Sequence, residues 1–140
     1  MKRFTHLSAL IECSAGVTPT VATLKRFITM LSGMGYTELY LGLTDAYKIP
    51  GEPYFNYKRG GYTAAELGEL DAHAAACGLE LIASIQTLGH LDYLERHESY
   101  RDLMDTHNIL MVGDERVYAL VDRMFAAISA GVTGVEFIPA

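Results

Sequence analysis

The sequence predicts an α/β fold: one domain over residues 1–140, with four parallel strands and three main helices forming half of a TIM (β/α)8 barrel. Apolar runs separated by amphipathic helical patterns lie at residues 7–13, 38–43, 79–85 and 135–138. Strands that alternate with helices pair in parallel through right-handed crossovers. A complete barrel of this type takes ~250 residues, so 140 residues correspond to about half of one.

The first helix is predicted from a cap signal and an apolar stripe. Thr18 followed by Pro19 is typical of a helix start, because threonine caps the first turn and proline needs no N–H partner there. Gly33 and Gly35 provide the stop. The stripe that faces the core comprises Val21, Leu24, Phe27, Ile28 and Leu31.

A long irregular segment over residues 44–62 follows the second strand. The strand itself is nearly all apolar, which is typical of a strand buried on both faces. Loops of this length are uncommon unless they are functional or disordered. Disorder is disfavoured because the segment contains Tyr47, Tyr54, Phe55, Tyr57 and Tyr62. We expect it to face a ligand, and a packed lid without a ligand is the alternative.

The remaining helices have clear start signals. Thr63 and Glu66 fit a capping box that opens the second helix. Asp114 is predicted to cap the third helix. Residues 91–113, between the third strand and this helix, show mixed character, with a short helix over 91–96 as one option.

Composition and charge argue against several functional classes. The net charge of −6 repels phosphate backbones, and no basic run is interleaved with aromatic residues, so nucleic-acid binding is not expected. No apolar run reaches the ~20 residues of a membrane span, and the N-terminus does not fit a signal peptide. The two cysteines lack metal-site or disulfide-framework spacing. We therefore expect no metal, no cofactor, no membrane partner and a cytoplasmic location.

Polar side chains follow three of the predicted strands. In parallel α/β folds, ligands are held at the carboxyl ends of the strands. His90 could instead be a buried imidazole bonded to a neighbouring strand, and Asp45 could cap a loop. The candidate ligand-binding residues are Glu12, Asp45, Tyr47, Gln86 and His90.

Several segments resemble glycoside hydrolase family 20, and most closely the β-N-acetylhexosaminidases without an extra N-terminal domain. The likeness runs from about residue 7 to about residue 128, and implies the N-terminal half of that family's (β/α)8 barrel. The segments that carry it are Gly35-Tyr-Thr-Glu-Leu-Tyr-Leu, Asp45-Ala-Tyr47, Gly51-Glu-Pro-Tyr-Phe-Asn-Tyr-Lys-Arg-Gly60, Tyr62-Thr63 and Glu80-Leu-Ile-Ala-Ser-Ile-Gln-Thr-Leu-Gly-His-Leu91.

The resemblance implies substrate-assisted retaining hydrolysis of terminal N-acetylhexosamine, in which the substrate's acetamido oxygen attacks the anomeric carbon. An Asp-Glu pair after the fourth strand orients that group and protonates the leaving oxygen. Asp45 and His90 match positions that line or support the sugar subsite, with Glu12, Tyr47 and Gln86 as further candidates.

The sequence departs from the family pattern in three places. It reads Val135-Glu-Phe-Ile-Pro-Ala140 where the Asp-Glu pair should begin, and Glu136 falls inside the strand, so we assign no catalytic residue. In the family an arginine that grips the terminal sugar follows the first strand, and Ala15 stands at the matching position here. The chain also contains no tryptophan, whereas the family encloses the acetamido group with aromatic residues from the second half of the barrel.

Three hypotheses follow. The chain is a part of a β-N-acetylhexosaminidase that is inactive alone; or it is a half-barrel scaffold that associates with a second copy; or it is a remnant that binds an N-acetylhexosamine-containing glycan weakly. The unpaired edges and exposed inner face of a half-barrel favour self-association as a homodimer.

Overall fold

The computed structural model describes residues 4–14 and 16–138, and it confirms the predicted fold class. A four-stranded parallel sheet has the order β1-β2-β3-β6, and three of the four helices are long. The elements are β1 (Ser8–Glu12), α1 (Val21–Gly33), β2 (Glu38–Gly42), α2 (Ala64–Ala76), β3 (Glu80–Gln86), α3 (Glu98–Arg101), β4 (Met104–Thr106), β5 (Ile109–Leu110), α4 (Glu115–Ser129) and β6 (Gly134–Ile138).

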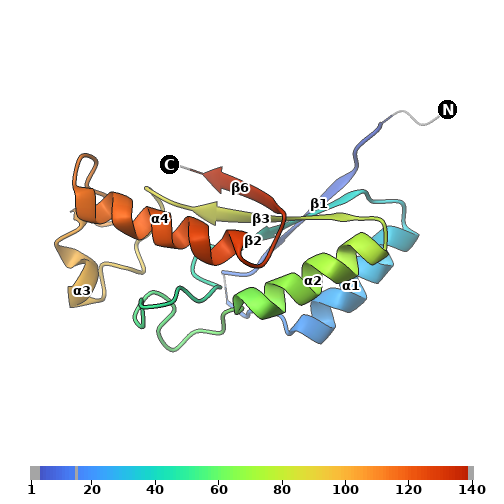
Figure 1. Ribbon diagram of the computed structural model, residues 1–140, viewed down its shortest axis with the longest axis horizontal. Coiled ribbons are helices and arrows are strands. Elements are labelled where there is room, and N and C mark those ends of the chain that lie inside the picture. The colour runs from blue at the N-terminus through green and yellow to red at the C-terminus, as the bar shows by residue number, and fades with distance from the viewer. Residues whose placement is uncertain (1–3, 15, 139–140) are drawn as a thin grey trace.

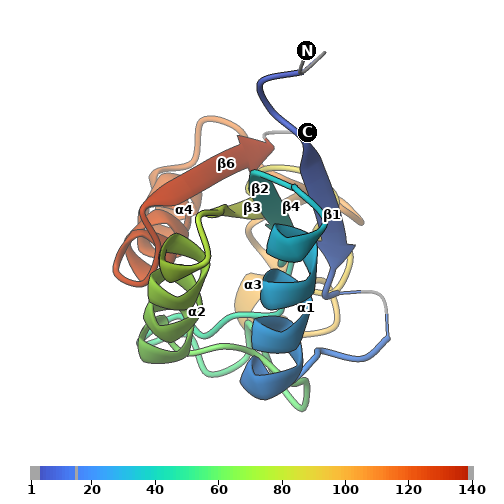
Figure 2. The ribbon, with the colours of Figure 1, turned by 90° about the vertical axis from the view of Figure 1, so that its right-hand side faces the viewer.

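Helices α1, α2 and α4 lie on one side of the curved sheet (Figure 1, Figure 2). Alternate strand residues such as Leu39, Leu41 and Leu81 are buried against apolar helix residues that include Leu24 and Leu70. This side of the sheet and its helices form the core.

The other face of the sheet is not covered by the described residues. Leu10 on this face is 65% exposed, and register pairs it with Tyr40, which in turn pairs with Ile82. The expectation that the second strand is buried on both faces is therefore wrong for this chain. The apolar run of β2 has side chains suited to burial on both faces of the sheet. In this chain only the outer face packs against helices, and the inner face, which carries Leu10 and Tyr40, stays open.

The helix caps are largely as predicted, with one shift. Thr20, and not Thr18, caps α1, since its hydroxyl accepts a hydrogen bond from Thr23 N at 3.2 Å. Thr18 instead donates to the carbonyl of Gly60 at 3.0 Å. The capping box of α2 is confirmed.

The segment between β3 and α4 differs from the expectation. Residues 92–96 form turns, and the short helix lies at Glu98–Arg101, followed by the antiparallel pair of β4 and β5. Buried Leu91, Leu94 and Tyr100 fix this segment to the body of the molecule. No helix among the described residues is long and apolar enough to cross a bilayer.

Candidate functional site

A pocket of about 300 Å³ lies on the open face of the sheet and extends to the carboxyl ends of the strands. All four strands of the sheet contribute to its lining. Its apolar lining includes Leu10, Tyr40 and Ile138. Its polar lining consists of Glu12, Thr44, Ser84, Gln86 and Glu136.

One register row crosses this pocket from edge to edge. Glu12 pairs with Gly42, Gly42 with Ser84, and Ser84 with Glu136. Gly42 leaves room for the carboxylate of Glu12, because a Cβ at Gly42 would lie only 2.9 Å from Glu12 Cδ. Ser84 Oγ donates to Glu136 Oε2 at 2.9 Å. The two edge strands thus each place a carboxylate beside the pocket, and Gly42 and the hydroxyl of Ser84 lie between the two carboxylates in this row.

Asp45 lies just past the end of β2 and is only 2% exposed. Arg59 Nε lies 3.1 Å from Asp45 Oδ2 and forms an ion pair with it. Asn56 Nδ2 donates to the main-chain carbonyl of Asp45 at 2.6 Å. Burial raises the pKa of the Asp45 carboxyl above its ordinary value, and the guanidinium of Arg59 opposes that shift.

Arg59 is the site residue that the sequence interpretation missed. Its guanidinium also donates to the carbonyl of Ser14, which follows β1, so one side chain ties the loop of residues 44–62 to two strand ends. Ala15, where the resemblance places an arginine, lies outside the described residues. A guanidinium has five N–H donors, and the contacts to Asp45 and Ser14 leave donors for a ligand.

The five predicted site residues do not all meet. Glu12 and Gln86 line the pocket, and the buried Gln86 Oε1 has no hydrogen-bond partner among the described residues. Asp45 lies beside the pocket, next to Thr44 in its lining. His90 is exposed with φ at 58° and does not line the pocket, so the alternative of a buried imidazole is wrong.

Tyr47 belongs to the core beneath the loop. Its ring packs against Phe55 at 5.1 Å between centroids, and only 1% of the residue is exposed. Its hydroxyl has no hydrogen-bond partner within the described part of the chain. Burial, and secondly the charge of Asp45, raise the pKa of the phenol well above its ordinary range. Sugar contact by Tyr47 stays a prediction, and the structure gives the residue a packing role.

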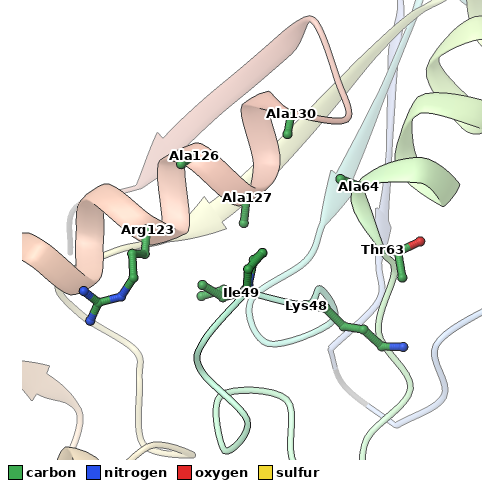
Figure 3. Close-up of a pocket in the computed structure, with 9 residues that line it drawn as sticks. Lys48, Ile49, Thr63, Ala64, Arg123, Ala126, Ala127 and Ala130 are labelled. Carbon is green, nitrogen blue, oxygen red and sulfur yellow. The ribbon is translucent and has the colours of Figure 1, made fainter.

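A second cavity, of about 380 Å³, lies between α4 and the start of α2, on the helix side of the sheet (Figure 3). Ile49 and Ala127 are among its mainly apolar lining residues. Lys48 and Arg123 stand at opposite ends of it in Figure 3, and Arg123 Nη2 already pairs with Glu52 Oε1 at 2.8 Å. Because its two cations do not converge, we assign no function to this cavity. In the described part of the chain, no three His, Cys, Asp or Glu side chains form a metal-binding group.

Neither a family model nor a curated protein sequence matches this chain. Solved structures do match it. A chitobiase from Flavobacterium johnsoniae has a TM-score of 0.82 at 18% identity, covering 96% of this chain and 23% of that chain. A family 20 β-N-acetylhexosaminidase from Streptomyces coelicolor A3(2) has a TM-score of 0.77 at 23% identity, covering 94% and 32%. A mutant Streptomyces plicatus β-hexosaminidase in complex with its product GlcNAc has a TM-score of 0.79 at 24% identity, covering 94% and 31%.

The likeness extends over almost all of this chain, while the chain spans only about a quarter to a third of the length of these structures. At identities below 25% the likeness concerns the fold. The chain therefore has the fold of one part of the glycoside hydrolase family 20 β-N-acetylhexosaminidases, as its sequence motifs predicted.

Proposed function

We propose that this chain forms the part of a family 20 glycosidase barrel that holds the terminal N-acetylhexosamine of a glycan. The observation that carries the proposal is the ion pair between buried Asp45 and partly exposed Arg59, beside the pocket that all four strands line and that extends to their carboxyl ends. Ligands of (β/α)8 enzymes bind at this end of the barrel.

The pocket suits sugar hydroxyls because it combines acceptors with donors. Of the lining residues, Glu12 can accept hydroxyl hydrogens and the hydroxyl of Thr44 can donate one, and Arg59, held by Asp45 beside the pocket, can donate to hydroxyl oxygens. Asp45 keeps the guanidinium in place, so the arginine loses little rotamer freedom when it binds a ligand. A few positioned polar groups in a concave site are typical of small-molecule binding.

Hydrolysis is assigned to the complete barrel and not to these 140 residues. Substrate-assisted cleavage requires an acid at the leaving oxygen and a carboxylate at the acetamido group. The only Asp-Glu dipeptide in the sequence is Asp114-Glu115. Asp114 accepts hydrogen bonds from the main-chain N–H and the guanidinium of Arg116, and so serves as the cap of α4.

The proposal is tested by titrating the 140-residue protein with N-acetylglucosamine while recording its amide NMR spectrum, with sorbitol as the control polyol. We expect the amides of residues 44–47 and 86–90 to shift with millimolar affinity and to remain unmoved by sorbitol. An unchanged spectrum at saturating sugar would refute the binding site. In a parallel assay, we expect no release of para-nitrophenol from its N-acetyl-β-glucosaminide, and steady release would refute the assignment of catalysis to the complete barrel.

We also propose self-association through the open face of the sheet, because Leu10 and Ile138 are exposed there and β1 and β6 are edge strands. Two copies related by a two-fold axis would pair these edges and close a barrel.

Glu12 and Glu136 also line this face, so added salt should strengthen association by screening their repulsion. Light scattering should then give twice the 15.4 kDa chain mass. A monomer at every concentration and salt level would exclude the homodimer.

A further inference from the structure

Three side chains with metal-binding or polar atoms meet between α1 and α2, which lie side by side on the helix side of the sheet (Figure 1, Figure 2). At the end of α2, Cys77 Sγ lies 3.7 Å from His73 Nε2, one helical turn earlier. From α1, Thr29 Oγ1 lies 3.1 Å from the same nitrogen and 3.9 Å from the sulfur. We call this group the Thr29–His73–Cys77 cluster.

Contacts between the two helices hold the cluster in place on both sides. One turn before it, Lys25 Nζ pairs with Glu69 Oε1 at 2.6 Å. At its other end, Ser32 Oγ donates to the carbonyl of Cys77 at 2.6 Å. The donor atoms of the cluster therefore need little reordering to bind a ligand together.

The distances within the cluster match those between ligands of one tetrahedral zinc ion. With zinc bonds of about 2.3 Å to sulfur and about 2.0–2.1 Å to nitrogen, the tetrahedral angle places these two atoms about 3.6 Å apart, close to the 3.7 Å between Cys77 Sγ and His73 Nε2. An oxygen ligand of the same ion would lie about 3.4 Å from the nitrogen and about 3.6 Å from the sulfur. Thr29 Oγ1, at 3.1 and 3.9 Å, meets both values after a small shift toward the sulfur.

Each of the three atoms can offer a lone pair to a cation. The hydroxyl of Thr29 donates its hydrogen to the carbonyl of Lys25 at 3.0 Å, which leaves lone pairs on its oxygen for other contacts. His73 Nε2 lies 3.2 Å from that carbonyl and can donate to it, and the tautomer with its proton on Nδ1 presents a lone pair at Nε2 instead. Cys77 is a free thiol, and it binds metals as the thiolate after releasing its proton.

We propose that the Thr29–His73–Cys77 cluster is a zinc site, with water as the fourth ligand. Thiolate and imidazole ligands favour Zn²⁺ over Mg²⁺ and Ca²⁺. The ion can enter through a surface cavity of about 460 Å³ that Thr29 and His73 help to line. Because the ligands come from two helices, the ion would clamp α1 to α2. The spacing of the two cysteines does not reveal this site, since its other donors are an imidazole and a hydroxyl.

The test is a titration of the reduced protein with Co²⁺, whose thiolate complexes absorb in the near ultraviolet, followed by displacement with Zn²⁺. We expect one Co²⁺ per chain and loss of the absorption band when Zn²⁺ is added. The variant C77S should lose the band, and H73Q and T29V should each weaken Co²⁺ binding about 10-fold or more. The controls C13A, at the buried cysteine, and H107Q, at an exposed histidine, should bind as the unsubstituted protein does.

Thermal unfolding gives a second, independent measurement. Saturating Zn²⁺ should raise the unfolding temperature of the unsubstituted protein, because it binds the folded state, and should leave that of C77S unchanged. Circular dichroism distinguishes a variant that has lost a ligand from one that has lost its fold. A band that persists in C77S, an affinity unchanged in H73Q or T29V, or an unsubstituted protein with neither a band nor a thermal shift would overturn the zinc site.

Discussion

At the scale of single residues, one buried carboxylate and one arginine organise the candidate site. Asp45 is almost completely buried, and Arg59 is the cation that compensates its charge. Leaving a buried charge without its partner is costly, since the desolvation penalty is then no longer offset. The geometry of the loop over residues 44–62 therefore depends on this pair.

We predict that Arg59→Gln lowers the free energy of unfolding by about 1–3 kcal/mol, below the range for fully buried pairs because the arginine is partly exposed. Urea denaturation measures this loss. The double variant D45N/R59Q should recover most of the stability, since no buried charge is left unpaired. The neighbouring variant K58Q is the control. Equal losses in R59Q and K58Q would show that the pair has no special role.

The raised pKa of Asp45 makes a prediction about pH. A folded-state pKa above the ordinary 3.8 means that the folded protein binds this proton more tightly than the unfolded chain does. The contribution to stability is thus complete below about 3.8 and is lost as the pH rises through the folded-state pKa. Asp45→Asn removes this loss. The stability difference between D45N and the unsubstituted protein should therefore shift in favour of D45N as pH rises from about 3 to about 7. A difference independent of pH would contradict the shift.

The residue pattern of the site was only partly accessible from the sequence. Asp45, Gln86 and Glu12 were predicted because strand ends are recognisable from apolar runs. Arg59 was missed because its position depends on how a long loop folds back onto β1 and β2, and no periodicity encodes that path. Tyr47 was predicted to be near a ligand, yet alternation cannot show that its ring turns toward the core.

At the scale of elements, local signals account for the helices and strands of the main sheet. Caps and periodic apolar residues located α1, α2 and α4 to within a few residues. The predicted cap of α1 was displaced because Pro19 precedes the cap residue instead of following it. The β4–β5 pair was not predicted, because its strands are too short for alternation to be recognised.

The two threonine caps offer a matched comparison. At α2, the hydroxyl of Thr63 accepts a hydrogen bond from Glu66 N, and the main-chain N–H and hydroxyl of Thr63 both donate to the Glu66 carboxylate. Thr20 at α1 lacks a glutamate partner. We expect Thr63→Ala to cost about 1 kcal/mol or more of unfolding free energy, and Thr20→Ala to cost less. Thermal and urea unfolding of both variants check this order. The reverse order would mean that the box adds nothing to the cap.

The same box carries a pH signature. Hydrogen bonds from the backbone and side chain of Thr63 lower the pKa of Glu66 below its ordinary 4.5. This stabilisation is present above 4.5 and is lost as the pH falls through the folded-state pKa. The cost of Thr63→Ala should accordingly shrink in acid, while the cost of Thr20→Ala stays constant. A constant cost for both variants would show that the Glu66 bonds do not contribute.

At the scale of the whole molecule, the main open question is the exposed face of the sheet, because none of the described elements of this chain covers it. The half-barrel was predictable from the number of alternating elements. The partner that covers the inner face could not be predicted. The apolar pattern of the strands indicates that this face is suited to burial, but it does not indicate which protein surface packs on it. A complete barrel and a pair of half-barrels both satisfy the same pattern.

We predict that Leu10→Glu abolishes self-association, since it places a charge on the exposed apolar face, on an edge strand that the second copy would pair with. Light scattering should return the 15.4 kDa mass of one chain for this variant. Met34→Glu is the matched control, because Met34 is equally exposed but caps the end of α1, on the helix side. Loss of the dimer in both variants would place the interface elsewhere.

The most direct test of the sugar site is a crystal structure of the protein soaked with N-acetylglucosamine. We predict electron density for one sugar at the carboxyl ends of the strands, with ring hydroxyls within hydrogen-bond distance of Arg59 and Glu12 or Gln86. Density for the sugar only at another surface, or an empty pocket at saturating sugar in crystals whose strand ends are open to solvent, would contradict the account.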